Sequence, residues 1–196
     1  MTFQEYRNVD LLLLTVITFI FEAIATLASN KWFYAQPIAL SITLLMVCMT
    51  MMRWGAYAIP VAVVGGAVYC FISAATIEQY IIYCIGNIGA LVAYFYIKKL
   101  GKEPIRGDHW LLGILAIIAY VGMAFGRWLV SLPFGGELTT LVGFLTSDII
   151  SLLFAVVVLC LLSKQDGMLE DQKAYLLRLD REKQDEHDNE DTDMIL

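Results

Sequence analysis

The sequence predicts an all-helical integral membrane protein with six transmembrane helices and both chain ends in the cytoplasm. Of its 196 residues, 59% are hydrophobic and only 16% are charged, which is too little charge to cover the surface of a soluble domain. The apolar residues form long runs that approach the ~20 residues a helix needs to cross a bilayer. The alternating pattern of a membrane barrel is absent, so the spans are expected to be helices.

Each expected span is an apolar run bounded by charged residues, proline or glycine. The six spans cover residues 10–29, 36–52, 55–73, 79–98, 110–130 and 138–162. Arg53 and Trp54 alone join the second and third spans in a tight hairpin. Pro60 is expected to kink the third span unless it lies in the first turns of the helix. The longest internal loop runs from Lys99 to His109, where glycine and proline break the helical pattern.

The orientation follows from the basic residues, which are retained on the cytoplasmic side. With the amino terminus inside, the outer segments hold only Lys31 and Arg127. The inner segments hold the other basic residues, Arg7, Arg53, Lys98, Lys99, Lys102, Arg106, Lys164, Lys173, Arg178, Arg181 and Lys183. An odd number of spans would spoil this asymmetry, so six spans are favoured.

The chain divides into a membrane domain, residues 1–163, and an acidic cytoplasmic tail, residues 164–196. The membrane domain is electrically neutral, so the tail carries the entire net charge of −6. A short surface helix is expected over Met168–Lys183, with Leu169, Leu176, Leu177 and Leu179 as a partial apolar stripe. Beyond Gln184 the tail is expected to be disordered. No basic stripe is available to bind nucleic acid, and the cysteines lack metal-ligand spacing, so no metal or other cofactor is expected.

Polar residues within the spans are the first candidates for function, because burying them in lipid is costly. They are Glu22, Asn87, Arg127 and Asp148, and the predicted topology places them from the midplane to the outer surface. This distribution favours a cavity that opens to the outside and is sealed toward the cytoplasm. The alternative is structural: Glu22 and Arg127 form one ion pair, and Asn87 ties helices together.

The outer loops add aromatic and charged residues to this candidate cavity. Trp32 and Tyr34 follow the first span, Glu78 precedes the fourth and Trp128 follows Arg127. Aromatic faces mixed with a few polar groups suit a small, planar, polar molecule. Two carboxylates against one arginine hint at a neutral or cationic substrate. The alternative is an ordinary belt of aromatic residues in contact with membrane lipid.

A stripe of small residues, Ala58, Ala62 and Gly66, lies along the third span. Such a stripe lets another helix approach closely, either within the same chain or in a partner protein. Catalytic signatures are missing, including a nucleophile elbow, a paired-histidine zinc motif and a nucleotide-binding glycine loop. The sequence therefore does not predict an enzyme.

In size, span number, inside termini and outward polar cluster, the chain resembles the substrate-binding subunits (S components) of energy-coupling factor transporters. Its segments Met52–Pro60 and Val64–Ala67 are similar to the second-to-third-helix region of that family. The resemblance implies a bacterial plasma-membrane protein that captures a vitamin-type molecule from outside. It also implies a transmembrane coupling subunit, driven by two ATPases, to which the small-residue stripe docks. By this resemblance Trp32, Tyr34, Glu78, Arg127 and Trp128 would contact the substrate. The intramembrane Glu22 and Asn87 complete the predicted site.

Two other classes of function fit the same sequence. In one, the chain is a membrane scaffold that transports nothing, its buried charges are structural and its tail recruits a cytoplasmic partner. In the other, it is an autonomous small transporter or channel. A channel would need polar groups along its full path, and most of the inner halves of the predicted spans lack them.

Overall fold

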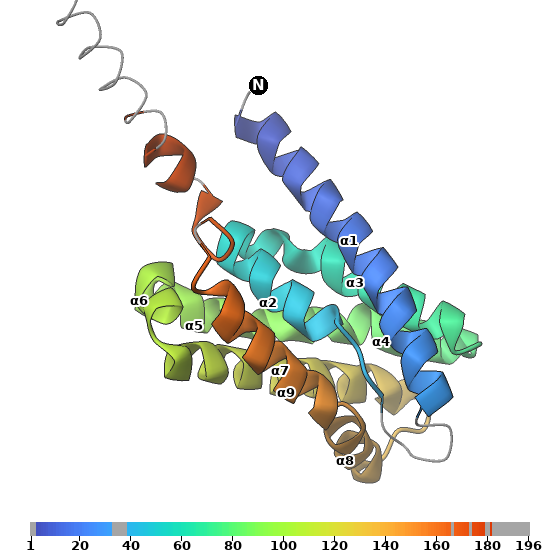
Figure 1. The fold of residues 1–196 in the computed structure, drawn as a ribbon. Helices are drawn as coiled ribbons and strands as arrows, with labels where there is room; N and C mark the ends of the chain where they lie inside the picture. Colours follow the sequence, from blue (N-terminus) through green and yellow to red (C-terminus); the bar gives the residue numbers. More distant parts are fainter. Residues whose placement is uncertain (1–2, 33–38, 166, 173, 179–180, 182–196) are drawn as a thin grey trace, which may run out of the picture.

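A computed structural model describes residues 3–32, 39–165, 167–172, 174–178 and 181. In this part of the chain all regular secondary structure is helical (Figure 1). The elements in chain order are α1 Phe3–Trp32, α2 Thr43–Trp54, η1 Gly55–Ala58, α3 Ile59–Ile72, α4 Ile77–Gly86, η2 Asn87–Val92, α5 Ala93–Leu100, α6 Lys102–Gly107, α7 His109–Ser131, η3 Leu132–Phe134, α8 Leu138–Ser147 and α9 Ile149–Leu162. Elements marked η are turns of 3₁₀-helix.

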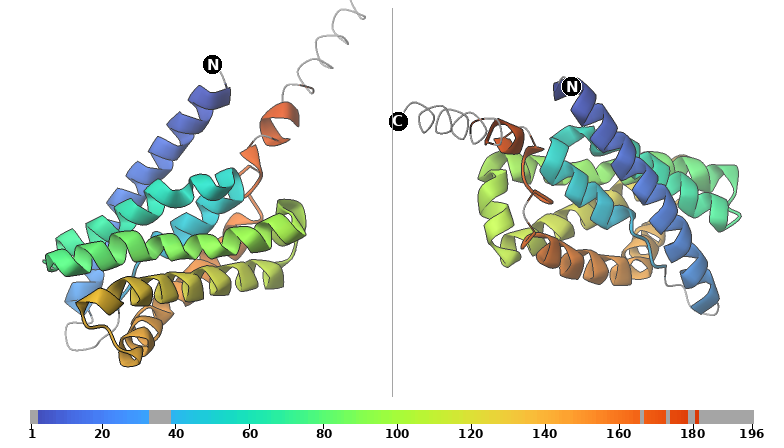
Figure 2. Two further views of the ribbon diagram at one scale, coloured as in Figure 1. Left: turned by 180° about the vertical axis from the view of Figure 1, so that it is seen from behind. Right: turned by 45° about the horizontal axis from the view of Figure 1, so that its top comes forward.

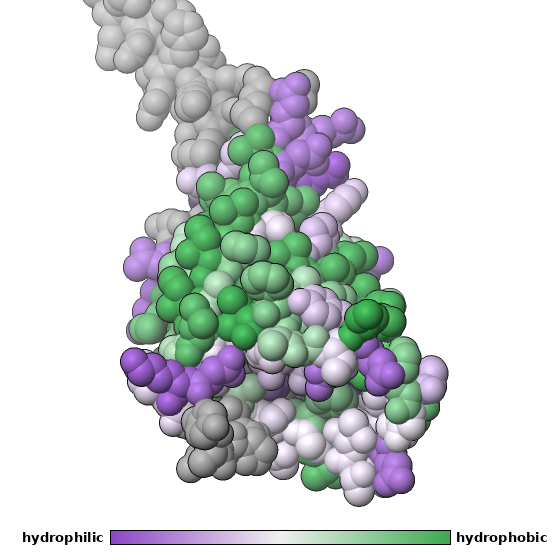
Figure 3. All heavy atoms as spheres, turned by 90° about the vertical axis from the view of Figure 1, so that its right-hand side faces the viewer, coloured by the Kyte–Doolittle hydropathy of each residue, from purple (hydrophilic) through white to green (hydrophobic). Residues whose placement is uncertain are grey.

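Several helical stretches are long and apolar enough to cross a membrane. Four of them are Phe3–Trp32, Thr43–Ile72, Ile77–Leu100 and His109–Phe134, and the bent pair Leu138–Ser147 and Ile149–Leu162 makes a fifth if it forms one span. Apolar side chains cover the middle of one face of the molecule, with hydrophilic residues above and below them (Figure 3). The prediction of an all-helical chain with several candidate membrane spans is confirmed.

The Thr43–Ile72 stretch reverses direction at Gly55. This glycine has φ +63°, a conformation that glycine adopts without strain. Thr43, at the start of α2, lies directly against Gly65 in α3, so the two helices form a hairpin. The 12 residues of α2 make a helix of about 18 Å, roughly half of a bilayer core of ~30 Å.

The second expected span begins differently from the prediction. Residues 36–38 lie outside the described part of the chain, residues 39–42 are not helical, and α2 starts only at Thr43. By length and composition, Thr43–Ile72 counts as one stretch. Six crossings and the sides of the two termini therefore stay predictions.

The hairpin helix α2 is the centre of the molecule. Every residue from Thr43 to Trp54 is buried, and the helix contacts α1, α3, α7 and α9. Its methionines Met51 and Met52 are fully buried, as are Leu112 and Leu115 of α7. Methionine fills irregular space between helices well, so this core needs no regular heptad pattern.

α4, η2 and α7 lie side by side, in contact through glycines (Figure 2). A Cβ atom on Gly122 would lie 2.5 Å from the carbonyl oxygen of Gly89, and one on Gly86 would lie 2.5 Å from Cα of Arg127. Gly126 packs equally closely against Gly86. Small residues let helix backbones approach in this way. The contact brings Asn87 of η2 next to Arg127 of α7.

The last predicted span, 138–162, is broken in the middle. α8 and α9 meet at Asp148 with a bend of 45°, although neither glycine nor proline stands there. The carbonyl group of Ser147, freed at the break, accepts a hydrogen bond from the backbone N–H of Ala39 at 3.0 Å. An external donor that replaces a helical hydrogen bond is an ordinary cause of a kink.

One end of the bundle carries Arg53, Lys98, Lys99, Lys102 and Arg106, and we call it the basic end. The C-terminal segment, residues 167–172 and 174–178, packs against it. Within the range predicted as a surface helix, Leu169 is fully buried in the main core whereas Leu177 is exposed. Leu179 and the region after Gln184 lie outside the described residues.

Candidate functional site

Glu22 lies in the middle of α1 with its carboxylate fully buried. The oxygen Oε2 accepts hydrogen bonds from the backbone N–H groups of Ile42 and Thr43, at 2.8 and 2.9 Å, and from the Thr43 hydroxyl at 3.0 Å. These donors surround the first turn of α2, whose own N-cap residue, Ile42, has no side-chain oxygen. Glu22 therefore caps α2 from a neighbouring helix.

The residues just before α2 form an extended segment that enters the core. Side chains and carbonyl groups of other helices satisfy its backbone. The bonds are Ala39 N–H to Ser147 O at 3.0 Å, Leu40 N–H to Ser29 Oγ at 3.0 Å, Ser41 N–H to Ser151 Oγ at 2.8 Å and Ser151 Oγ to Ala39 O at 3.2 Å. Irregular backbone is tolerated at membrane depth only when protein or a wet cavity surrounds it. The extended segment and the α8–α9 break thus provide hydrogen-bond partners for each other's backbone groups.

Arg127 and Asp148 form a buried ion pair beside this junction. The arginine is 2% exposed and the aspartate 4%, and Nη1 of Arg127 donates to Oδ2 of Asp148. Nε of Arg127 donates to the Asn87 amide oxygen at 2.7 Å, and Nδ2 of Asn87 donates to the carbonyl oxygen of Ala62 at 3.2 Å. Two buried charges are tolerated when they are paired and hydrogen-bonded in this manner.

Aromatic rings surround the same guanidinium. Its Cζ atom lies 4.4 Å from the ring centre of Tyr83 and 6.0 Å from that of Phe144. Tyr69 stacks on Tyr83 at 4.8 Å, and all three rings are half-buried rather than sealed inside. Such rings stabilise a desolvated cation. We call this group, Tyr69, Tyr83, Asn87, Arg127, Phe144 and Asp148, the Arg127 cluster.

The hydrogen-bonding capacity of Arg127 is not fully used within the described part of the chain. Nη2 donates only to the sulfur of Met123, at 3.7 Å, and a thioether is a weak acceptor. Charged donors form their strongest bonds with oxygen acceptors. The cluster therefore keeps a strong donor, beside aromatic rings, whose partner within the described residues is only a weak acceptor.

The predicted substrate residues separate into two groups. Asn87 and Arg127 belong to the cluster, whereas Glu22 is engaged at α2. Trp32 is 72% exposed at the end of α1, and Glu78 is exposed in the first turn of α4. Trp128 is half-buried and donates from Nε1 to the carbonyl oxygen of Glu137 at 3.1 Å. Tyr34 lies outside the described residues.

The structural alternative for the buried charges was wrong in its pairing. Arg127 is paired with Asp148, and Glu22 binds α2 instead. The sequence analysis also missed Tyr69, Tyr83 and Phe144. The available signal was the helical spacing of Tyr83 and Asn87, which are four residues apart and therefore share one helix face.

The small-residue stripe faces the interior of this chain. Ala58, Ala62 and Gly66 are all buried. A Cβ atom on Gly66 would lie 2.8 Å from the backbone carbonyl of Tyr83 and 2.9 Å from Nδ2 of Asn87. The stripe thus positions α4 and its polar residues, and its use by a partner protein stays a prediction.

Comparison with known proteins assigns no family to the chain. It matches no protein-family model, no curated protein and no solved structure. Among the described residues, no group of three or more His, Cys, Asp or Glu side chains is arranged to hold a metal ion. The fold and the site together define an all-helical chain with candidate membrane spans and a buried ion pair at a helix break.

Proposed function

We propose that the protein binds a small organic molecule at the Arg127 cluster, as the membrane-embedded substrate-binding subunit of an importer. One observation carries the proposal: a buried arginine, placed among half-buried aromatic rings, keeps one nitrogen that donates only to a thioether within the described residues. An oxygen of the substrate would be a far better acceptor. A site with one strong polar anchor and aromatic walls is typical of small-molecule binding.

The interrupted helices support a transport role. Broken helices concentrate backbone polar groups and charges at membrane depth, and transporters use such breaks to bind their substrates. Here the α8–α9 break carries Asp148, and the extended segment before α2 meets the break through the bond between Ala39 and Ser147. A moderate change in the bend would move Asp148 relative to Arg127.

The cluster also narrows the class of substrate. Arg127 and Asp148 together carry no net charge, and Glu22 is already engaged at α2. A neutral, planar molecule with a carbonyl-type oxygen suits such a site, with its ring against Tyr69, Tyr83 or Phe144. Vitamin-type micronutrients belong to this chemical class.

We propose further that the chain crosses a bacterial plasma membrane six times, with its basic end in the cytoplasm. The hairpin of α2 and α3 and the gathering of lysine and arginine at one end support this topology. Because the sequence has no nucleotide-binding glycine loop, uptake would rely on a separate coupling subunit with ATPases. A cysteine introduced at Lys99 should react with impermeant reagents only from the cytoplasmic side.

Mass spectrometry of the detergent-purified protein tests the binding function directly. We expect a small organic molecule to co-purify with the unmodified chain and to be lost from Tyr69→Ala. Phe125→Ala is the matched control, since this ring is exposed on the outside of α7. If the unmodified chain carries no molecule, or if Tyr69→Ala retains it as well as Phe125→Ala does, the proposal fails and a scaffold role is favoured.

A further inference from the structure

The C-terminal segment is more deeply anchored than an acidic tail needs to be. Leu169 is fully buried in the main core, and Gln172 is 1% exposed. A turn at Gly167, with φ +76°, redirects the chain after α9 so that it crosses the basic end. Burial of this kind fixes the segment at a defined place.

One side of the segment is bound to α1 and α2. Nη1 of Arg53 donates to the carbonyl oxygens of Gly167 and Met168, at 2.8 and 3.3 Å. The Tyr6 hydroxyl donates to the side-chain oxygen of Gln172 at 3.3 Å. Arg53 is itself held by Asp10 of α1 at 2.8 Å. The end of α2, the start of α1 and the C-terminal segment therefore form one hydrogen-bonded unit.

The other side of the segment is bound to α6. Asp171 pairs with Lys102 at 2.5 Å, and Glu170 pairs with Arg106 at 3.4 Å. Glu170 is nearly buried and has a second partner, Arg178, at 3.0 Å in the same segment. Two consecutive carboxylates thus face two cations on one short helix.

The segment consequently connects α1 and α2 on one side with α6 on the other, which are far apart in the sequence. A direct polar contact between these parts is the bond from Nζ of Lys102 to the carbonyl oxygen of Arg53, at 3.2 Å. Without this segment, Lys102 would lose its ion pair with Asp171 and Arg106 its ion pair with Glu170. Arg53 would keep Asp10 but lose two carbonyl acceptors. An acidic peptide is the ligand that such a surface fits.

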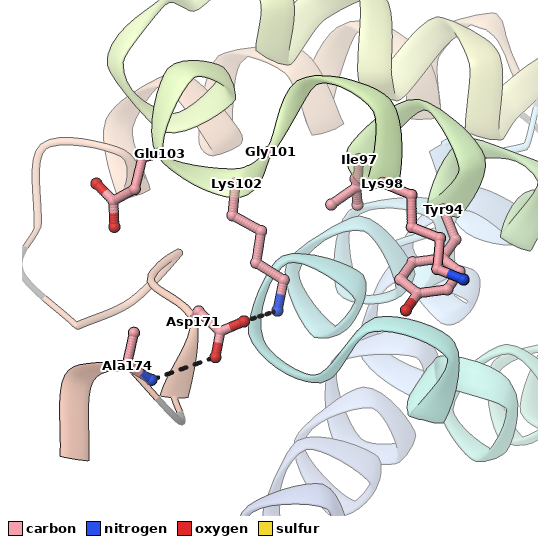
Figure 4. Close-up of a pocket in the computed structure, with 8 residues that line it drawn as sticks. All are labelled: Tyr94, Ile97, Lys98, Gly101, Lys102, Glu103, Asp171 and Ala174. Carbon is pink, nitrogen blue, oxygen red and sulfur yellow. Dashed lines mark hydrogen bonds and ion pairs between the residues drawn. The ribbon is translucent and has the colours of Figure 1, made fainter. Parts of the chain in front are cut away.

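The packing of this bridge is incomplete. A cavity of about 370 Å³ remains between the segment and α5, bordered by Tyr94, Lys98, Lys102 and Asp171 (Figure 4). The side chains of Lys102 and Asp171 are 18% and 35% exposed, so solvent reaches their ion pair. Partly solvated ion pairs contribute little to stability, and regions with open packing separate at low cost.

We infer that the C-terminal segment is a releasable clasp: it binds the basic surface of Arg53, Lys102 and Arg106 as an acidic peptide and holds α1 and α2 against α6. Release of the clasp would let these elements move apart at the basic end. Arg127 lies 18 residues after His109 in α7, about 27 Å along the helix, so the clasp acts at the end away from the proposed binding site.

Two truncations of the full chain test the clasp by hydrogen exchange. A chain that ends at Arg181 keeps the clasp and serves as the matched control for a chain that ends at Ser163. We expect the shorter chain to exchange amide hydrogens of α6 and η1 about tenfold faster or more, and the longer one to behave like the full chain. A peptide of residues 164–181 should restore protection to the shorter chain. Equal protection in both truncated chains would overturn the inference.

Swapping the charges of the Lys102–Asp171 ion pair distinguishes the clasp from a general effect of truncation. Lys102→Glu and Asp171→Lys should each accelerate exchange in α6, and the double substitution should return it toward the rate of the unmodified chain. Lys102→Gln replaces Lys102→Glu if the reversal prevents folding. If the single changes have no effect, or the double variant is no better than either, the ion pair does not hold the segment. Retention of a co-purified molecule in the Ser163 chain would show that the two proposals are independent.

Discussion

Replacing Asp148 by asparagine removes the charge that balances the buried Arg127 guanidinium while keeping the size of the side chain. Arg127 is 2% exposed, and its other close partners, the Asn87 amide oxygen and the Tyr83 ring, are neutral. Breaking a buried ion pair from one side costs about 3–5 kcal/mol, because an uncompensated charge is left behind. We expect the lower limit, about 3 kcal/mol, since the amide and the ring still stabilise the cation.

The assay is reversible unfolding of the purified chain in detergent micelles. Asp108→Asn is the matched control: it makes the same chemical change at an exposed N-cap, where Asp108 accepts from the N–H of Trp110 at 2.8 Å. Asparagine caps helices as well as aspartate does, so we expect a change within about 0.5 kcal/mol.

A paired replacement completes the test. Arg127→Met together with Asp148→Leu removes both charges, and apolar side chains of similar size often replace a buried ion pair without loss. We expect this variant to recover most of the stability that Asp148→Asn loses. The reasoning is refuted if Asp148→Asn unfolds within about 1 kcal/mol of the unmodified chain, or if the paired variant is less stable than the single one.

Three further substitutions test other contacts by the same unfolding measurement. Glu22→Ala removes the carboxylate that accepts from Ile42 and Thr43 and should cost about 1–3 kcal/mol; an unchanged free energy of unfolding would contradict the capping role. Gly122→Ala should cost about 1–3 kcal/mol by overpacking, whereas Gly113→Ala in the same helix has nothing within 4 Å of the new Cβ and should be neutral. Trp128→Phe loses one exposed hydrogen bond and should cost about 1 kcal/mol or less, unless the loop after α7 depends on it.

The positions of the long helices could be predicted because an apolar run of spanning length permits few other structures. The span expected at 110–130 is seen as α7, His109–Ser131, and its start agrees with the capping signal of Asp108. The small stripe likewise indicated a close helix contact, and Gly66 makes one with α4. Local pattern was sufficient in both cases.

The start of α2 and the break at Asp148 could not be predicted in the same way. Leu40 and Ile42 are apolar in any conformation, and the extended segment is stabilised by Ser29 and Ser151, which lie far away in the sequence. The break likewise depends on a donor from residue 39 rather than on a local helix breaker.

The ionic partner of Arg127 could not be predicted from the depth at which each acidic residue lies in its span. Glu22 and Asp148 are both intramembrane acids, and depth alone favours neither. The choice depends on which helices touch: α7 contacts α8 and α9, which meet at Asp148. The neighbouring contact with Asn87 did leave a signal, because Gly122 and Gly126, which pack against Gly89 and Gly86, have the small-xxx-small spacing.

The capping of α2 by Glu22 has a consequence for how the protein is made. With 12 residues, α2 is well short of the ~20 needed to insert as a separate span, so it is expected to enter the bilayer together with α3. The N–H groups of Ile42 and Thr43 both donate to a carboxylate on a helix that is synthesised earlier. Because α1 is synthesised before α2, the Glu22 carboxylate is already present when α2 forms. A newly made chain without this carboxylate would expose backbone N–H groups at the start of α2 to lipid during biogenesis.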